Sequence, residues 1–263
     1  MKSASWSKKE LIVFDLDGTL AKSKAVMDSE MSQLLVELLA VKKVAVIGGG
    51  KYGLFRTQLV SLLKKCPKEL LKNLFLFPTT STAFYRYDRG WKNVYTLGLS
   101  TREREKIKRA FHGVMKEAGY VPPKNVYGKV IEDRGTQITF SALGQEIVAR
   151  LGEKEGVRLK EKWRKENGTI KLKMAKMLEE RLPEFEVHAA GFTSIDVTQK
   201  GIDKAYGIRQ IEKHLHVPIK KMLFVGDALF RGGNDYAAKR TGILCVAVRG
   251  PEDTKEVIRK ILN

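Results

Sequence analysis

The 263-residue sequence predicts an α/β fold, namely a doubly wound parallel-sheet (Rossmann-like) core with an inserted α+β cap domain. Short, continuously apolar segments such as 11–14 and 44–47 alternate with segments of helical spacing. This pattern is typical of parallel strands that are buried on both faces. From about residue 84 the pattern changes to alternating strands and longer helices, and the apolar strands return after residue 203. We therefore expect one core that is interrupted by a cap.

The core is predicted in two parts, residues 1–83 and 188–263. In the first part the leucines between residues 34 and 39 recur at helical spacing, and Pro78 stops the last strand. Its predicted elements are a strand at 11–14, a helix at 29–39, a strand at 44–47, a helix at 54–63 and a strand at 74–77. The second part is expected to contain a helix at 203–215, strands at 222–225 and 243–248, and a closing helix at 251–262.

The cap is predicted at residues 84–187. Its first two strands have the spacing of a hairpin, and Ser100 with Glu103 has the pattern of a capping box at a helix N-terminus. The expected elements are strands at 84–87 and 93–97, a helix from 100 to about 118, strands at 126–131 and 136–140, a helix at 168–181 that ends before Pro183, and the last cap strands at 185–189 and 194–197.

The chain is strongly basic, with a formal net charge of +19 and a pI of about 9.8. Such a field attracts anions, which are either nucleic acids or phosphorylated metabolites. Segments such as 153–165 mix both signs, as exposed helices do, and the sequence contains no signature of an RNA- or DNA-binding module. A nucleic-acid partner is therefore disfavoured, and a phosphorylated small molecule is expected.

The sequence also bears on location and on the cysteines. No apolar run has the length of a membrane span, and residues 1–10 contain no apolar signal core. We therefore expect a cytoplasmic protein without a membrane partner. Cys66 and Cys245 lie far apart on apolar segments, which favours buried thiols over a disulfide or a metal pair.

Two carboxylates follow the first predicted strand, in the segment Asp15-Leu16-Asp17-Gly18-Thr19. Ligands of open α/β sheets gather beyond the carboxyl ends of strands, and two acidic groups there repel each other unless a cation lies between them. A small set of oxygen ligands favours Mg²⁺, which shares its coordination shell with waters and a phosphate. The segment predicts metal-assisted phosphoryl transfer with a carboxylate nucleophile, rather than aspartates of a loop or a helix cap.

Two further motifs accompany this segment. A second apolar strand ends in Gly226-Asp227 and is followed by Gly232-Gly233-Asn234-Asp235, while Lys200-Gly201-Ile202-Asp203-Lys204 precedes it. Together with the D-x-D-G-T pattern at 15–19, these motifs resemble the signatures of the haloacid dehalogenase superfamily. The whole chain resembles the capped subfamily IIB and, within it, the eukaryotic-type phosphomannomutases, which have similar strings at 194–197, 203–206, 232–235 and 251–254.

The resemblance implies roles for the acidic residues. Asp15 would be the nucleophile, and Asp17 would act as general acid and then as base, while its backbone carbonyl binds the metal. Asp227 also ends a strand and is expected to bind the metal. Three roles are open for Asp235: to bind Mg²⁺, to hold its hydrating water, or to orient Lys204. The expected metal set is thus Asp15, Asp17, Asp227 and Asp235.

Lys204 is expected to balance the negative charge of the aspartates and of the phosphoryl group. Lys200 is the competing candidate, but the string at 203–206 matches the family better. Asn234 would donate an amide hydrogen bond near the phosphate, and the glycines before it could equally form only a turn.

The second signature of the superfamily falls on Gly48-Gly49-Gly50. The family usually has a Ser or Thr that binds the phosphate where this chain has Gly50. The backbone N–H groups of Gly49 and Gly50 can still cradle a phosphate at a helix N-terminus, but the side-chain donor is missing.

The cap is expected to choose the substrate. Arg134, Ser194 and Asp196 match sugar- or phosphate-contacting positions of phosphomannomutases, although Arg134 could equally form an ion pair with Glu132 or Asp133. Two other cap arginines have no counterpart, and Gln145 stands where one of them is expected. Since a mutase must hold a second phosphate, the loss of bidentate anchors favours a phosphatase.

The sequence thus predicts Mg²⁺-dependent phosphoryl transfer through an aspartyl-phosphate, with hydrolysis of a small sugar phosphate monoester as the first choice. The alternative is phosphomannomutase-like interconversion of hexose 1- and 6-phosphates. An alternative of another class is a non-catalytic, basic nucleic-acid-binding protein, which would not need the Asp15 and Asp17 pair. The resemblance also allows for a homodimer through the cap.

Overall fold

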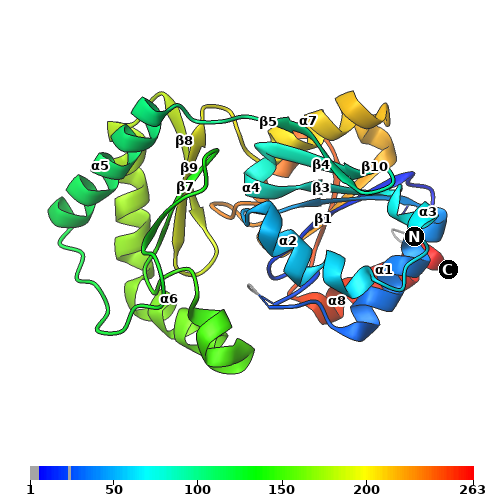
Figure 1. The fold of residues 1–263 in the computed structure, drawn as a ribbon, viewed down its shortest axis with the longest axis horizontal. Coiled ribbons are helices and arrows are strands. Elements are labelled where there is room, and N and C mark those ends of the chain that lie inside the picture. Colours follow the sequence, from blue (N-terminus) through cyan, green and yellow to red (C-terminus); the bar gives the residue numbers. More distant parts are fainter. Residues whose placement is uncertain (1–5, 23–24) are drawn as a thin grey trace. The chain divides into compact units, whose positions relative to one another are not determined.

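The computed structural model describes residues 6–22 and 25–263 and divides the chain into two compact units (Figure 1). The core is formed from the described residues of Met1–Thr96 and from Asp203–Asn263. The cap is the continuous segment Leu97–Ile202. The chain therefore leaves the core once and returns to it, as expected for an inserted domain.

The core alternates strands and helices in the order that its apolar segments predict. Its elements are β1 (Leu11–Asp15), α1 (Ser29–Val41), β2 (Lys43–Ile47), α2 (Tyr52–Gln58), η2 (Val60–Leu63), α3 (Lys68–Leu71), β3 (Leu74–Phe77), α4 (Pro78–Ser81), β4 (Ala83–Tyr87), β5 (Trp91–Thr96), α7 (Lys204–Leu215), η3 (Ile219–Lys221), β10 (Met222–Gly226), η4 (Tyr236–Thr241), β11 (Leu244–Ala247) and α8 (Pro251–Leu262).

The core strands form one seven-stranded sheet in the order β11-β10-β1-β2-β3-β4-β5. The strands from β11 to β3 are parallel, whereas β4 and β5 are antiparallel to their neighbours. Along β1, Ile12 and Phe14 belong to one buried cluster, and Leu11 and Val13 belong to another. Because both faces are covered, every position of such a strand must be apolar. The predicted fold class is confirmed.

The two faces of this sheet carry different helices. Residues of α1, α2 and α8 join the cluster that contains Ile12, and residues of α7 and η4 join the cluster that contains Val13. Helices α1 and α8 lie side by side, although they come from opposite ends of the chain (Figure 1). The carboxyl edge of the parallel strands is left for loops, which is where open sheets of this kind bind ligands.

The cap has a simpler, two-layer architecture. Its elements are α5 (Thr101–Glu117), β6 (Ile131–Asp133), β7 (Ile138–Ser141), α6 (Ile147–Arg181), β8 (Phe185–Ala190) and β9 (Ser194–Gln199). The strands form an antiparallel sheet in the order β6-β7-β9-β8. One face of this sheet packs against α5 and α6 through a core that includes Phe111, Phe140 and Val197. The predicted capping box of α5 is present, since Ser100 accepts from the Glu103 N–H group at 3.3 Å and Glu103 accepts from the Ser100 N–H group at 2.7 Å.

The bounds of the cap differ from the expected residues 84–187. The hairpin of β4 and β5 extends the core sheet, because Leu76 and Phe75 of β3 pair with Tyr85 and Arg86. At the other end, β8 and β9 pair with each other and with β7 of the cap. The pattern of a half-buried strand does not say which sheet the hairpin of β4 and β5 joins, whereas the strands expected at 185–189 and 194–197 lie in the cap sheet as expected. Both boundaries of the cap therefore lie further toward the C-terminus than residues 84 and 187.

The cap helix α6 is longer than the predicted helix at 168–181. It begins at Ile147, and its path is kinked at Gly152, which has φ of 78°. It is also strongly charged. Within the part of the chain that the structure describes, no helix is both long and apolar enough to cross a membrane. Both cysteines are free; Cys66 is buried as expected, and Cys245 is half-buried.

Candidate active site

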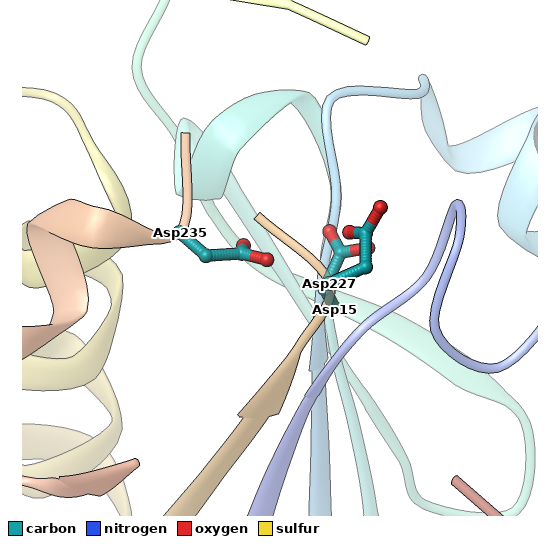
Figure 2. A group of neighbouring side chains, drawn as sticks. All are labelled: Asp15, Asp227 and Asp235. Atoms are coloured by element: carbon teal, nitrogen blue, oxygen red, sulfur yellow. The ribbon is translucent and has the colours of Figure 1, made fainter. Parts of the chain in front are cut away.

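Three aspartates meet at the carboxyl edge of the core sheet. Asp15 is the last residue of β1, Asp227 follows β10, and Asp235 precedes η4. One carboxylate oxygen from each lies within 4.8 Å of the others. Figure 2 shows the Asp15 and Asp227 carboxylates next to each other and the Asp235 carboxylate pointing toward them from a separate segment. The parallel pairing of β1 with β10 produces this cluster, because it brings both strand ends to one edge.

Lys204 lies among these aspartates as the first residue of α7. Its Nζ donates to Asp15 Oδ1 at 2.5 Å and also to Asp235 Oδ1, and its side chain is only 3% exposed. Asp203 caps the helix by accepting from the Tyr206 N–H group at 2.8 Å, which fixes the start of α7 at this point. By contrast, Lys200 donates to the Phe185 carbonyl within the cap at 3.4 Å. The structure thus brings Lys204, and not Lys200, to the aspartates.

Both oxygens of Asp235 are used within the core. Oδ1 accepts from Lys204, and Oδ2 accepts from the backbone N–H of Ala228 at 2.9 Å. Of the three roles open for Asp235, the orientation of Lys204 therefore has the most direct support. Asp15 differs, because its Oδ2 is buried and has no hydrogen-bond partner among the described residues.

Two glycines allow these groups to approach closely. Gly18 has φ of +93°, and a Cβ there would lie 2.4 Å from Asp227 Oδ2. A Cβ on Gly207 in α7 would lie 2.2 Å from Ser81 Oγ. Glycine at these positions therefore lets the loop after β1 reach Asp227 and lets α7 bring Lys204 close to the sheet.

The electrostatics of the cluster favour an added cation. Burial raises the pKa of Asp15 well above its usual range, Asp235 and Asp227 raise it further, and Lys204 opposes them. Burial, followed by the charge of Asp235, raises the pKa of Asp227 to about 6. Burial alone would lower the pKa of Lys204, but Asp15 and Asp235 raise it. Three carboxylates thus face one ammonium group, and hard oxygen donors with a buried, unpartnered oxygen on Asp15 suit Mg²⁺.

Asp17 has a partner that the sequence reasoning missed. Gln58 is buried at the end of α2, and its Nε2 donates to Asp17 Oδ1 at 3.2 Å and to the Ala25 carbonyl at 3.0 Å. The sequence feature that could have indicated this contact is the polar Gln58 within the largely apolar helical segment 54–63. Gln58 can hold the Asp17 carboxyl in one orientation beside the cluster.

The glycine loop after β2 is held by the unusual turn α4. Thr79 and Thr80 donate their backbone N–H groups to the carbonyls of Gly50 and Gly48, each at 2.9 Å. The backbone φ angles of Thr79, Thr80 and Ser81 are 48°, 56° and 72°, in a region that residues other than glycine rarely adopt. The turn fixes the loop that would cradle a phosphate through Gly49 and Gly50. Asn234 directly precedes Asp235 on the same edge of the core.

Of the predicted substrate residues of the cap, Ser194 and Asp196 lie on β9, and Arg134 lies in the turn between β6 and β7. Arg134 Nε donates to Glu132 at 2.8 Å, and its Nη2 donates to Gln145 Oε1 at 3.1 Å. The ion pair with Glu132 that the sequence left open is therefore present. Asp196 on β9 is buried and accepts from Thr139 Oγ1 at 2.7 Å. Ser194 begins the same strand, opposite Ser141.

The chain is similar to known proteins over its whole length. A family described as eukaryotic phosphomannomutase matches residues 31–263. A probable phosphomannomutase of Caenorhabditis elegans is 25% identical over 266 residues, which cover 98% of this chain and 97% of that protein. A phosphomannomutase of Spinacia oleracea is 27% identical over 257 residues, or 95% of each chain.

Solved structures with a similar fold come from other enzymes. An IMP-nucleotidase of Plasmodium falciparum has a TM-score of 0.72 and 19% identity, covering 100% of this chain and 73% of that one. A trehalose-6-phosphate phosphatase domain of C. albicans has a TM-score of 0.63 and 16% identity, covering 99% of this chain and 95% of that one. At this level of identity the similarity establishes the fold.

Proposed function

Because the chain belongs to the eukaryotic phosphomannomutase family of the haloacid dehalogenase superfamily, we propose that it interconverts hexose 1- and 6-phosphates by Mg²⁺-dependent phosphoryl transfer. The observation that carries this proposal is the cluster of Asp15, Asp227 and Asp235, in which Asp15 and Asp235 are buried and both bind Lys204. The sequence alone put hydrolysis first. The family match supports the mutase alternative better.

The residues of the cluster divide the proposed chemistry between them. The unpartnered Oδ2 of Asp15 would attack the phosphorus atom, and the bond from phosphorus to the sugar oxygen would break. Asp17, held by Gln58, would give its proton to the leaving sugar oxygen. Return of the phosphoryl group to another hydroxyl of the sugar would return that hydroxyl's proton to Asp17. The aspartyl-phosphate on Asp15 links the two halves.

Lys204 and Asp235 have a supporting role in this proposal. Lys204 would stabilise the negative charge on the transferring group, and Asp235 would keep its ammonium in place. Mg²⁺ would be held by Asp15, Asp227 and the Asp17 carbonyl. When bound, it would neutralise part of the phosphoryl charge. The Gly49 and Gly50 amides and Asn234 would bind the phosphate oxygens.

Hydrolysis remains the second candidate because of one observation in the cap. Arg134 is held by Glu132 and Gln145, and Gln145 itself occupies the position of an expected arginine. A cap that grips a bound sugar phosphate weakly would let water reach the aspartyl-phosphate.

Phosphorus NMR of the reaction with mannose 1-phosphate and a hexose bisphosphate primer separates the two candidates. The mutase proposal predicts that mannose 6-phosphate accumulates. If free phosphate dominates over isomerised hexose phosphate, the mutase proposal fails and hydrolysis replaces it.

A further inference from the structure

The residue that caps α7 and the first residue of that helix both form charge pairs with one segment of the core. Lys204 donates to Asp235, which directly precedes η4, and Arg240 within η4 donates to Asp203. One pair takes its base from α7, and the other takes its acid from the cap of α7. Helix α7 and η4 also pack against each other. The start of α7 is therefore held to residues 235–240 by two charge pairs.

Asp203 uses both of its carboxylate oxygens to fix the first turn of α7. Oδ1 accepts from the Tyr206 N–H group at 2.8 Å, and Oδ2 accepts from Arg240 Nη2. The Asp203 backbone carbonyl accepts from the Gly207 N–H group at 3.0 Å. The Asp203 side chain is only 5% exposed, so water contributes little to satisfying its charge. The cap fixes the turn internally, and the contact with Arg240 fixes the place of the turn relative to η4.

The place of this turn decides which oxygen of Asp15 remains for the reaction. Lys204 Nζ donates to Asp15 Oδ1 at 2.5 Å, whereas Asp15 Oδ2 has no hydrogen-bond partner among the described residues. Because both oxygens belong to one carboxylate, a small shift of the helix start would bring the ammonium toward Oδ2 or away from Asp15. A misplacement of about 1 Å can lower an enzymatic rate by about a hundredfold. The role of Lys204 therefore depends on a fixed start of α7.

Arg240 combines an exposed side chain with a buried partner. Its side chain is 61% exposed, whereas that of Asp203 is 5% exposed. Arg249 forms the same kind of pair with Asp253, but there the side chains are 90% and 32% exposed. Asp253 lies in the first turn of α8, away from Lys204 in the sequence. Arg249 therefore offers a control of the same chemistry outside the Lys204 cluster.

We propose that Asp203 and Arg240 are positioning residues of the active site, which hold α7 so that Lys204 binds Asp15 Oδ1 and leaves Oδ2 for the attack on phosphorus. This inference rests on the proposed function, because it assigns both residues to the reaction of Asp15. They act through Lys204, and hydrolysis through Asp15 would need them in the same way.

The first test observes Lys204 without measuring turnover. In full-length protein with ¹⁵N-labelled lysine side chains, the buried, hydrogen-bonded ammonium of Lys204 should exchange slowly with water and give a separate NMR signal. Lys204→Arg, which keeps the charge, identifies this signal by removing it. We expect Arg240→Ala to shift or broaden the signal and Arg249→Ala to leave it unchanged.

A second variant separates the charge pair from the helix cap. Asparagine still accepts the Tyr206 N–H group, so Asp203→Asn should keep α7 capped while it removes the charge that Arg240 binds. We expect Asp203→Asn to move the Lys204 signal as Arg240→Ala does. The double variant should add little further change, because both substitutions break one interaction.

Kinetics connect the placement of Lys204 to the reaction. Arg240→Ala should lower kcat for mannose 1-phosphate by about tenfold with little change in KM, because Lys204 acts on the transferring group in the transition state. Arg240→Lys keeps the charge and should restore part of the rate. Since the Arg240 side chain is largely exposed, guanidinium ions from solvent should also raise the kcat of Arg240→Ala, and urea at the same concentration should not. Arg249→Ala should behave like wild type in each measurement.

The results that would overturn the proposal are distinct from those that would overturn the proposed function. An unchanged Lys204 signal in Arg240→Ala would overturn the proposal. So would an Arg240→Ala variant that is less stable yet keeps the wild-type kcat, because a merely structural ion pair has that effect. If wild type fails to isomerise mannose 1-phosphate while Arg240→Ala still displaces the Lys204 signal and guanidinium restores it, the placement of Lys204 by Arg240 stands and the proposed function fails.

Discussion

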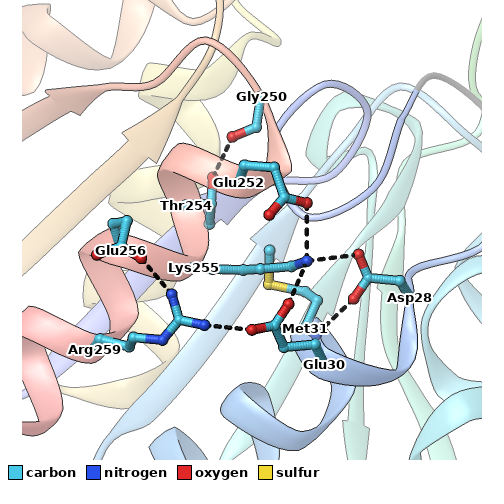
Figure 3. A network of polar contacts seen from close by, with 9 residues as sticks. All are labelled: Asp28, Glu30, Met31, Gly250, Glu252, Thr254, Lys255, Glu256 and Arg259. Carbon is cyan, nitrogen blue, oxygen red and sulfur yellow. Dashed lines mark hydrogen bonds and ion pairs between the residues drawn. The ribbon is translucent and has the colours of Figure 1, made fainter.

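Two lysines of the core each bind several carboxylates, yet their environments differ. Lys204 binds Asp15 and Asp235, whose side chains are 5% and 0% exposed. Lys255 on α8 binds Asp28, Glu30 and Glu252 at 2.8 to 2.9 Å, and these side chains are 50%, 52% and 79% exposed (Figure 3). The ammonium groups are alike, so the difference lies in how much water reaches the carboxylates.

The pKa values of the carboxylates follow this difference. Burial raises the pKa of Asp15, despite Lys204. Around Lys255, the pKa of Glu30 is lowered by Lys255. Burial acts to raise the pKa of Asp28, but the Met31 N–H group and Lys255 together outweigh it and lower that pKa. Solvated carboxylates are satisfied by one lysine, and their network joins α1 to α8. Buried carboxylates need a further cation, so the Lys204 cluster is suited to binding a metal ion.

The largest expected contrast is in turnover. Asp15→Asn should reduce kcat by a factor on the order of 10³ or more, because it removes the nucleophile and a metal ligand. Asp28→Asn is the matched control in the other network. Asparagine still caps a helix well, so Asp28→Asn should keep kcat within about twofold. Steady-state kinetics of both variants test the comparison, and equal activity of Asp15→Asn and wild type would refute it.

The two networks should also differ in metal dependence, because only the aspartates around Lys204 are expected to bind Mg²⁺. EDTA should abolish turnover and Mg²⁺ should restore it, whereas Ca²⁺, which accepts larger and looser shells, should restore little. Asp227→Asn should raise the Mg²⁺ concentration needed for half-maximal rate by about tenfold. Full activity in metal-free buffer would contradict the assignment of Asp15 and Asp227 as ligands.

A smaller contrast is expected in stability. Lys204→Met leaves buried carboxylates without their counter-charge, which costs about 3–5 kcal/mol of unfolding free energy when one partner of a buried pair is removed. Lys255→Met leaves carboxylates that water can solvate, so the loss should be less than half as large. Urea denaturation followed by circular dichroism measures both, and equal losses would show that burial of the carboxylates does not distinguish the two networks.

The smallest effect is a difference in pH dependence. The pKa of Asp227 is raised from 3.8 to about 6, so the folded protein binds more protons than the unfolded chain between these values. In metal-free buffer the Asp227 contribution to the unfolding free energy should therefore fall as pH rises from about 4 to 6. The difference in unfolding free energy between wild type and Asp227→Asn isolates this contribution. A difference that stays flat or rises with pH over this range would argue against the raised pKa.

The sequence predicted the parts of the fold and the site that depend on local pattern. Asp15 and Asp227 end apolar strands, and such strands pair in parallel, so their meeting follows from the alternation of strands and helices. The confirmed fold class rests on the same pattern. The bounds of the cap were not predictable in this way, because the hairpin of β4 and β5 has the same alternation whether it pairs with β3 or with a cap strand.

Other features depend on contacts between distant segments. Gln58 binds Asp17, which lies 41 positions away in the sequence, and the residues next to Gln58 do not predict that contact. Lys160 and Lys171 look like solvated charges of a long helix, and the Gly191 carbonyl that accepts from Lys171 comes from the distant turn between β8 and β9. Arg134 matches a motif of the family, but that motif does not predict the hydrogen bond that Arg134 donates to Gln145.

Trapping the phosphoryl group on the enzyme tests directly whether Asp15 is the nucleophile. Wild type and the Asp15→Asn and Asp28→Asn variants are mixed rapidly with a hexose bisphosphate and Mg²⁺, quenched in acid, and analysed by intact-protein mass spectrometry. We expect one added phosphoryl group in wild type and in Asp28→Asn, released by hydroxylamine as expected of an acyl phosphate, and none in Asp15→Asn. A phosphoryl group that is present to the same extent in Asp15→Asn would contradict this role of Asp15.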